Sequence, residues 1–579
     1  MSLESSPATT WSLAFVAGLV RSGVQHLVLS PGSRSQALAL SADAISQSEG
    51  SDFHVHVCID ERTAGFFGLG LAAQSRRPVA LLCTSGSAPA HYLPALLEAK
   101  HSGIPLIALT ADRPEELRGI GANQTTNQVG MFGHAVHTSV EVPAPEETAR
   151  LAEEARRYAS EAVDRAQEGA ERGRPGPVHL NVGFREPLSS QISAEQLRNG
   201  ALTAVVTTRE SPTEESPRVV TLDPEPGTVV IAGHLAGPEA EQLAQDLGAV
   251  LVAEVHSGAR FGKNLVVAYR ELLEAAPQGQ EIGRVVCVGR PTLARQTQKL
   301  LSQTDIEQLI WQRGEPEPSN FSGTVQIVDD VRVSRVATDI EARQWVAPWV
   351  TASRARLEQK SVVLEPPAPD VEALASDIAS DRARFAEKEM SVVRKSVTRR
   401  DIAREVWENT WPEDQLILGS SRMIREFDRV VPGKKIPVWS NRGLSGIDGT
   451  IATARGFASA RSHAGLAGLT RVVLGDLALL HDAGSLLLQE SEQDNSRLQV
   501  LVVVDGGGSL FDSLAVAETA NPDAYERVVF TPAEVDLESL VTAYGWSYRK
   551  ANDLGGLIEA LADTSKQLLI ECPVERAEP

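Results

Sequence analysis

Two aspartates near the C-terminal end of the sequence have the type and spacing of metal ligands. Asp476 follows the apolar run Val472–Leu474 and Asp505 follows the run Val500–Val504, and each lies beside glycine. The carboxyl ends of neighbouring parallel strands meet at one edge of a sheet, where open α/β sheets bind ligands. Two carboxylates with glycine-exposed carbonyls favour a hard cation such as Mg²⁺, which usually also binds phosphate groups. Each aspartate alone is more typical of a helix cap, but the two together, with the three glycines Gly506–Gly508, favour a metal and diphosphate site.

A third carboxylate stands at the end of a predicted strand over residues 53–59. Glu61 lies between Asp60 and Arg62 and precedes a glycine-rich helix predicted over residues 64–75. A carboxylate that faces such an apolar helix is desolvated, which raises its pKa and suits proton exchange with a nitrogen base. The alternative is a helix capped by Asp60 and a solvated Glu61. The glycines of this helix do not have GxGxxG spacing, so a dinucleotide site is not predicted.

Candidate anion contacts follow several other predicted strands. The turn Pro31–Arg34 opens an Ala/Leu helix, where backbone N–H groups and a guanidinium can hold an anion. The loop over residues 119–133 is rich in glycine and carboxamides, which is typical of a polar binding surface. Ser421, Arg425 and Arg442 stand at successive turns near the C-terminal end. Each is also compatible with plain solvent exposure, but their grouping in a chain of net charge -21 favours an anion pocket.

These residues require a scaffold of alternating strands and helices. Such alternation recurs in three stretches and predicts an α/β protein of three doubly wound parallel-sheet domains, over residues 1–190, 191–360 and 361–579. Polar, Pro-containing segments over 191–227 and 355–398 are interpreted as linkers. Helices are predicted over 9–23 and 146–172 and from within 482–488. The small residues over 449–460 predict a helix packed closely against another one, with a second subunit as a candidate source.

The composition excludes several classes of function. A net charge of -21 and a pI near 5.1 argue against a nucleic-acid surface, which needs clustered cations. The four cysteines are far apart, lie in or beside apolar runs and form no CxxC, which is typical of reduced thiols in the cytoplasm. No apolar run approaches the roughly 20 residues of a membrane span, and the N-terminus lacks a signal pattern. We therefore expect a cytoplasmic protein without membrane insertion.

The two aspartates also carry a family resemblance. Residues 475–477, GDL, and Asp505, 29 residues after Asp476, resemble the thiamine diphosphate (ThDP) motif that begins GDG and ends NN. The sequence departs from that motif at Leu477, Asp505 and Gly506, but an aspartate still offers an oxygen to a metal. The three expected domains resemble the pyruvate-oxidase-like architecture of ThDP enzymes.

Further motifs narrow this resemblance and cover essentially the whole chain. The sequence resembles the 2-succinyl-5-enolpyruvyl-6-hydroxy-3-cyclohexene-1-carboxylate (SEPHCHC) synthases of menaquinone biosynthesis, the MenD family. The motifs are SPGSRSQ (30–36), IDERTAGFFGLGLA (59–72), TSGSAPAHYLPALLEA (84–99), TADRP (110–114), GANQTTNQ (121–128) and SNRGLSGIDGTIATA (440–454). Of these, SNRGLSGIDG and GANQ are specific signals.

The resemblance implies the cofactors and the residues that bind them. ThDP would bind with Mg²⁺, or with Mn²⁺ in its place. The metal ligands would be the side chains of Asp476 and Asp505 and the carbonyl of Gly507. The cofactor would also contact Gly508, Ser509 and Leu510, with Leu510 beneath the thiazolium ring. Glu61 would be the catalytic residue that shares a proton with the aminopyrimidine, and it would come from the neighbouring subunit of a homo-oligomer, a dimer or a dimer of dimers.

The resemblance also implies the substrates. The reaction would be decarboxylation of 2-oxoglutarate followed by 1,4-addition of the resulting carbanion to isochorismate. The 2-oxoglutarate-derived part would be held by Ser421, Arg425 and Arg442, and isochorismate by Ser33, Arg34, Arg113, Asn123 and Gln124. In the central domain the family carries a Lys-Arg pair, whereas Ala294-Arg295 offers a single cation here.

Two other functions share parts of this pattern. Another ThDP-dependent 2-oxoacid decarboxylase, or a carboligase like acetolactate synthase, would use the same cofactor residues, but its substrate needs fewer arginines. A non-catalytic nucleotide-binding protein could be built on the same sheets, but it has no need of Glu61 aimed at a cofactor ring. The arginines and Glu61 therefore favour the SEPHCHC synthase reaction.

Overall fold

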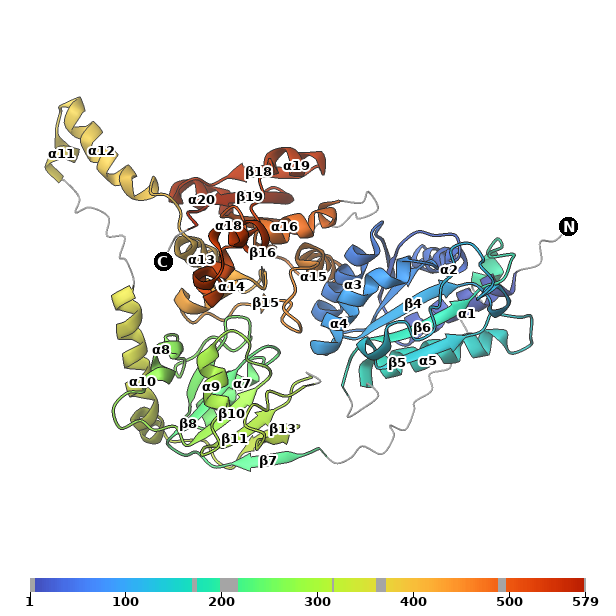
Figure 1. Cartoon of the computed structure of the whole chain (residues 1–579), viewed down its shortest axis with the longest axis horizontal. Coiled ribbons are helices and arrows are strands. Elements are labelled where there is room, and N and C mark those ends of the chain that lie inside the picture. The colour runs from blue at the N-terminus through green and yellow to red at the C-terminus, as the bar shows by residue number, and fades with distance from the viewer. Residues whose placement is uncertain are drawn as a thin grey trace.

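Three large parallel sheets follow one another along the chain, together with a parallel pair of strands (Figure 1). The computed structural model describes residues 6–168, 174–197, 217–314, 317–360, 371–487 and 496–576. Helices lie on both faces of the sheets, so the prediction of an α/β fold with doubly wound parallel sheets is confirmed. None of the helices in these ranges has the length and apolar character needed to cross a membrane.

The first sheet has six strands in the order β2-β1-β3-β4-β6-β5. Successive side chains of its buried strands point to opposite faces, so Leu82 packs beneath α1, α2 and α5 while Leu81 packs against α3 and α4. The elements are α1 (Pro7–Arg21), β1 (His26–Leu29), α2 (Gln36–Ser46), β2 (His54–Val57), α3 (Glu61–Ser75), β3 (Val79–Cys83), α4 (Leu93–His101), β4 (Leu106–Asp112), β5 (Thr138–Val142), α5 (Leu151–Glu168) and β6 (Val178–Gly183).

The second sheet has five strands in the order β12-β11-β10-β8-β9, and the pair β13-β7 lies beside it. Its strands are rich in valine and isoleucine and are buried on both faces. The elements are β7 (Val219–Leu222), β8 (Thr228–Ala232), α7 (Glu239–Asp246), β9 (Val250–Ala253), α8 (Tyr269–Glu274), β10 (Arg284–Val288), α9 (Arg295–Leu301), β11 (Glu307–Trp311), β12 (Gln326–Val328), β13 (Asp330–Val333) and α10 (Asp339–Lys360).

The third sheet has six strands in the order β15-β14-β16-β17-β19-β18. Helices α11 (Val371–Ala375) and α12 (Ala379–Val393) precede it and extend away from the three sheets (Figure 1). The other elements are α13 (Arg399–Glu408), β14 (Gln415–Leu418), α14 (Arg422–Val430), β15 (Val438–Trp439), α15 (Thr450–His463), β16 (Leu469–Gly475), α16 (Asp476–His481), β17 (Arg497–Val504), α17 (Ala515–Thr519), α18 (Pro522–Tyr525), α19 (Leu537–Ala543), β18 (Ser547–Lys550), α20 (Leu554–Leu561) and β19 (Gln567–Pro573).

Helices α3 and α15 join the first sheet to the third (Figure 1). A Cβ atom at Gly70 would lie 2.0 Å from the carbonyl oxygen of Thr453, and one at Gly456 would lie 2.1 Å from that of Phe67. Only glycine allows the two backbones to approach so closely. The predicted close packing of the small-residue helix is therefore confirmed, and in this structure its partner helix belongs to the same chain.

Several predicted boundaries were wrong. A helix was expected to begin within 482–488, and a 3₁₀ helix over Ala483–Leu486 does begin there, but the α-helix of this stretch, α16, begins earlier, at Asp476, directly after β16. The Asp476 carboxylate accepts the N–H of Leu477 in the first turn of α16. Leu488 lies outside the described residues. The helix expected over 146–172 begins only at Leu151, after the prolines at 143 and 145, and residues 169–173 lie outside the description. The stretches interpreted as linkers contain β7, α11 and α12, and residues 198–216 and 361–370 in them are not described.

Candidate active site

The two predicted metal ligands meet at the carboxyl edge of the third sheet. Strands β16 and β17 are neighbours, with Gly475 paired to Val503, so Asp476 and Asp505 emerge side by side. Asp476 is buried, and its Oδ2 accepts the N–H of Gly506 at 2.9 Å. Burial, and then the negative charge of Asp505, raises the pKa of Asp476 to about 6. Two carboxylates that repel each other in a buried place favour a bound cation.

Asp505 already has a positive partner. The guanidinium of Arg399, which is 2% exposed, donates from Nη2 to Asp505 Oδ2 at 2.6 Å, and the Ser509 hydroxyl donates to the same oxygen. These contacts fix the orientation of the carboxylate.

The glycine turn after Asp505 is too tight for side chains. A Cβ atom at Gly507 would lie 2.6 Å from the carbonyl oxygen of Phe530, and Gly506 has a φ of +83°. The next residues form a 3₁₀ turn over Ser509–Ser513, which presents the half-buried Leu510. This oxygen donor set of two carboxylates beside bare backbone carbonyls fits a hard divalent cation with a diphosphate.

Glu61 is the first residue of α3 and is half-buried. Asp60 caps the helix, accepting the N–H of Arg62 at 2.8 Å, so the capping interpretation holds for Asp60. Arg62 in turn donates to the carbonyl of His481 at 2.8 Å, and Thr63 lies 3.2 Å from Ser485, hydroxyl to hydroxyl. The start of α3 therefore contacts the end of α16, the helix that Asp476 opens, and the 3₁₀ turn that follows it in the same chain.

The predicted isochorismate contacts form one cluster above the first sheet. Arg113 donates to the Ser85 hydroxyl at 3.0 Å and to the Asn123 carbonyl at 2.9 Å. Gln124 exchanges two hydrogen bonds with Ser85, each of 3.0 Å. Arg34 is buried, and burial followed by the charge of Arg113 lowers its pKa. These residues, which come from the connections after three strands, β1, β3 and β4, are therefore brought together.

Ser33 precedes Arg34 in this loop and is exposed. Arg34 donates from Nη1 to the carbonyl of Phe184 at 2.9 Å. Its Nε is buried and has no partner among the described residues. The Arg34 guanidinium is thus anchored at one nitrogen and has a free donor at another.

The predicted 2-oxoglutarate contacts lie at the opposite, third-sheet side. Ser421 is the N-cap of α14, and Arg425, one turn later, donates to its carbonyl at 2.6 Å. Arg442 is buried and donates to Thr292 Oγ1 and to the Thr292 carbonyl, each at 3.0 Å. Burial lowers the pKa of Arg442 to about 10, and its Nη1 has no partner among the described residues. The negative charge of buried Glu254 acts on both Arg425 and Arg442 and favours their charged forms.

Arg295 differs from the other predicted contacts. It is exposed in the first turn of α9, and within the described ranges no hydrogen bond joins it to the arginines of the third sheet. The neighbouring cation, Arg290, instead donates to the carbonyls of Arg442 (2.9 Å) and Gly443.

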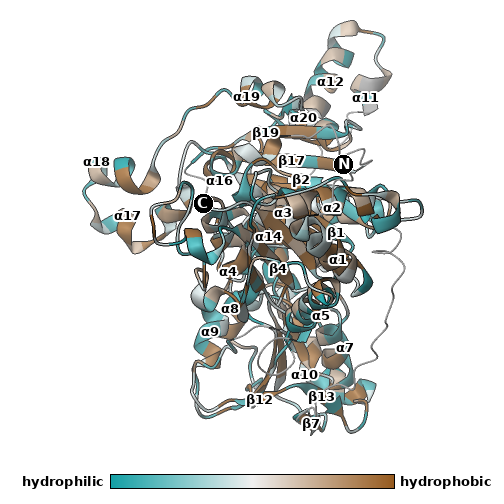
Figure 2. Ribbon diagram, turned by 90° about the vertical axis from the view of Figure 1, so that its right-hand side faces the viewer, coloured by the Kyte–Doolittle hydropathy of each residue, from teal (hydrophilic) through white to brown (hydrophobic). Residues whose placement is uncertain are grey.

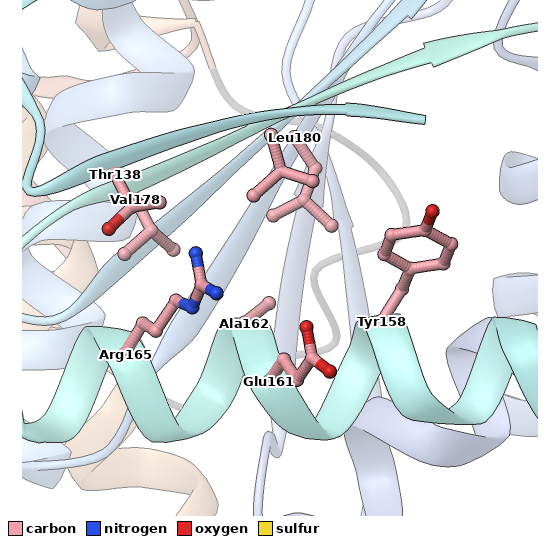
Figure 3. A pocket seen from close by; sticks show the side chains of 8 residues that line it. Thr138, Tyr158, Glu161, Ala162, Arg165, Val178 and Leu180 are labelled. Atoms are coloured by element: carbon pink, nitrogen blue, oxygen red, sulfur yellow. The ribbon is translucent and has the colours of Figure 1, made fainter. Parts of the chain in front are cut away.

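A small pocket lies elsewhere on the first sheet (Figure 3). It is bounded by α5, which contributes Tyr158 and Arg165, and by strands β5 and β6, which contribute Thr138 and Leu180. None of the predicted site residues lines it. The carboxyl edges of the sheets, and not this pocket, carry the candidate chemistry.

Known proteins share both the sequence and the fold. Residues 9–131 match the family model of the thiamine pyrophosphate enzyme N-terminal TPP binding domain. The chain is 46% identical to a SEPHCHC synthase of Leifsonia xyli subsp. xyli, covering 99% of this chain and 97% of that one. The chain belongs to the SEPHCHC synthase family. A second member, from Clavibacter michiganensis subsp. michiganensis, is also 46% identical, with the same coverage.

The fold is similar to that of a solved decarboxylase structure. Benzoylformate decarboxylase from Polynucleobacter necessarius matches with a TM-score of 0.64 at 16% identity and covers 98% of this chain and 99% of its own. At this identity the match supports the fold alone. The resemblance to SEPHCHC synthases drawn from the motifs and the pyruvate-oxidase-like architecture expected from them are both confirmed.

Four residues that contact the predicted site residues, or one another beside them, were missed in the sequence. Ser85 lies in the recognised TSGS turn, Arg399 opens a helix, Glu254 ends a buried strand and Thr292 follows Arg290. Only Ser85 had a local signal, a hydroxyl in a glycine turn after a strand. The other three are linked to the site by contacts across 38 to 150 residues of sequence.

Proposed function

We propose that this chain catalyses the ThDP- and Mg²⁺-dependent decarboxylation of 2-oxoglutarate and the 1,4-addition of the resulting carbanion to isochorismate. The product is SEPHCHC, an intermediate of menaquinone biosynthesis. The observation that carries this proposal is the 46% identity to SEPHCHC synthases over 99% of the chain. The gathering of arginines around two separate carboxylate-binding places supports it.

The third-sheet edge would hold the cofactor. The side chains of Asp476 and Asp505 and the carbonyl of Gly507 would bind Mg²⁺, or Mn²⁺, and Gly508, Ser509 and Leu510 would flank ThDP. When bound, ThDP supplies a stabilised carbanion at the carbon that loses CO₂. We further propose that the three sheets mark domains over 1–190, 191–360 and 361–579.

Glu61 would hold a proton at the aminopyrimidine ring of the cofactor, and we propose that it comes from a second copy of the chain. Supporting this, three apolar residues beside the site loops are exposed: Ile59 by 67%, Leu444 by 51% and Ile447 by 37%. Burial of such side chains between subunits is favourable. We propose that the protein is a homo-oligomer and that it lies in the cytoplasm.

The arginines would bind substrate carboxylates. Arg442 and Arg34 each bury a guanidinium nitrogen without a partner among the described residues, and a carboxylate would satisfy it. With Ser421 and Arg425, Arg442 would hold the 2-oxoglutarate portion. Ser33, Arg34, Arg113, Asn123 and Gln124 would hold isochorismate, and Arg295 would contribute only if α9 turned toward the site.

One assay tests the function. The protein is incubated with 2-oxoglutarate, isochorismate, ThDP and Mg²⁺, and isochorismate loss and product mass are followed. We expect SEPHCHC to form, and to form only when 2-oxoglutarate is present. Turnover of pyruvate without isochorismate would instead support the decarboxylase alternative, and no turnover by folded, cofactor-loaded protein would overturn the proposal.

A further inference from the structure

The segment that follows β19 holds in place a projecting arm of the third sheet, residues 509–530. The guanidinium of Arg576 donates to both carboxylate oxygens of Asp512, at 2.9 and 3.0 Å, and to Glu526 at 2.5 Å. The same guanidinium lies 3.6 Å from the ring centroid of Phe530. Tyr525 adds a hydrogen bond to Asp512 at 2.7 Å. A single side chain therefore gathers three parts of the arm over residues 509–530.

Within the described part of the chain, much of this arm is exposed. Helices α17 and α18 stand apart from the body of the molecule (Figure 2). None of the residues of α17 is buried, and Leu514 and Val528 are 36% and 65% exposed. Charge-assisted, bidentate hydrogen bonds are among the stronger polar contacts, and the stacking of Arg576 on an aromatic face adds to them. The Arg576 clamp is therefore a principal restraint on the arm.

The arm ends against the glycine turn of the proposed metal site. The carbonyl of Phe530 accepts the N–H of Gly508 at 2.6 Å, and Ala533 donates to the carbonyl of Gly506 at 3.2 Å. Gly507 packs on the ring and carbonyl of Phe530 so closely that a Cβ atom would not fit. The position of Phe530 thus determines the position of this turn.

The backbone of the same segment contacts the other side of the site. Arg399 donates from Nη1 to the Glu575 carbonyl at 2.7 Å while its Nη2 holds Asp505. Arg422, the first residue of α14, donates to the Arg576 carbonyl at 3.4 Å. Residues 575 and 576 are therefore tied both to the arm and to the arginine that orients a proposed metal ligand.

We propose that Arg576 is a positioning residue for the cofactor. By holding Asp512, Glu526 and Phe530 in place, it keeps the Gly506–Gly508 turn and Leu510 in the geometry that binds ThDP with its metal. Arg576 acts through these residues, since its side chain contacts the arm. The inference rests on the proposed function for its effect on cofactor binding, whereas its effect on the arm does not.

The test compares R576A and R576K with the control R335A. Arg335 also makes a two-contact pair with a carboxylate, Glu341, but this pair lies between the end of β13 and the start of α10, away from the proposed site. Hydrogen exchange of peptides covering 508–530 is measured in the cofactor-free protein, and ThDP binding with Mg²⁺ is measured by calorimetry. We expect R576A to exchange at least about tenfold faster in these peptides and to bind ThDP about tenfold more weakly. R576K, which retains the charge, should recover part of the protection from exchange and part of the ThDP affinity. R335A should change neither the exchange rate nor the affinity.

Two results would overturn the proposal. One is unchanged exchange over 508–530 in R576A. The other is weakened ThDP binding that R576K and R335A share equally with R576A, which would indicate a general loss of stability. Should R576A not fold, D512N breaks the same contact from the arm and replaces it. If the wild-type protein does not bind ThDP but R576A still exchanges faster over 508–530, the role of Arg576 in holding the arm is supported. The proposed function is then refuted instead.

Discussion

Adding one methyl group at Gly507 should separate cofactor binding from folding. In Gly507→Ala the new Cβ would lie 2.6 Å from the carbonyl oxygen of Phe530 and 2.8 Å from its ring. The carbonyl cannot move freely because it accepts the N–H of Gly508. Overpacking of this kind costs about 1–3 kcal/mol. If the turn moves to relieve the contact, metal and ThDP binding is weakened by this free energy. Each loss of about 1.4 kcal/mol lowers the affinity tenfold.

The matched control is Gly283→Ala, because a Cβ atom at Gly283 would meet nothing within 4 Å. ThDP affinity at saturating Mg²⁺ is measured by calorimetry, and the melting temperature of the cofactor-free protein by circular dichroism. We expect Gly507→Ala to bind ThDP about 10- to 100-fold more weakly and the control to bind as the wild type does. Equal affinity in Gly507→Ala and wild type would refute the placement of the metal at this turn.

Three further predictions concern single side chains. Glu61→Gln should keep the melting temperature and most ThDP affinity but lower kcat at least about 100-fold; near-normal kcat would remove Glu61 from its role. Arg442→Lys should raise the KM for 2-oxoglutarate at least about tenfold, because lysine cannot replace a buried bidentate donor; an unchanged KM would remove Arg442 from the substrate site. Burial raises the pKa of Glu254 to about 7, so its contribution to stability is present at low pH and is lost as the pH rises through 7. Melting temperatures from pH 5 to 8 should therefore fall more steeply for wild type than for Glu254→Gln, by an equivalent of about 3 kcal/mol, and parallel curves would contradict this.

The sequence predicted what local patterns determine. Buried runs such as Val500–Val504 become strands, so the edge that holds Asp476 and Asp505 followed from their position after such runs. The helix of small residues packs as expected, because glycines 70 and 456 require a close neighbour. Family motifs supplied the substrates, which spacing alone did not.

Long-range contacts were beyond local patterns. In the sequence, Arg399 is indistinguishable from a solvent-exposed charge at the start of a helix. Folding buries it against Asp505, 106 residues away. Glu254 reads as the end of a strand, but three backbone and side-chain groups of residues 292 and 293 surround it. Arg295 was predicted as the substrate contact of the central stretch, whereas it is Arg290 that reaches the Arg442 loop. Which charged residue becomes buried depends on tertiary packing that no short segment encodes.

The central claim is that Glu61 and the Asp476–Asp505 edge form one active site between two copies of the chain. Inactive Glu61→Gln and Asp476→Asn proteins can be mixed, dissociated and reassembled, and SEPHCHC formation measured. Because half of randomly formed dimers are mixed and each holds one intact site, the account predicts about a quarter of wild-type activity. If the site lay within a single chain, as the Arg62–His481 contact would permit, reassembled mixtures would stay inactive, and that result would contradict the account.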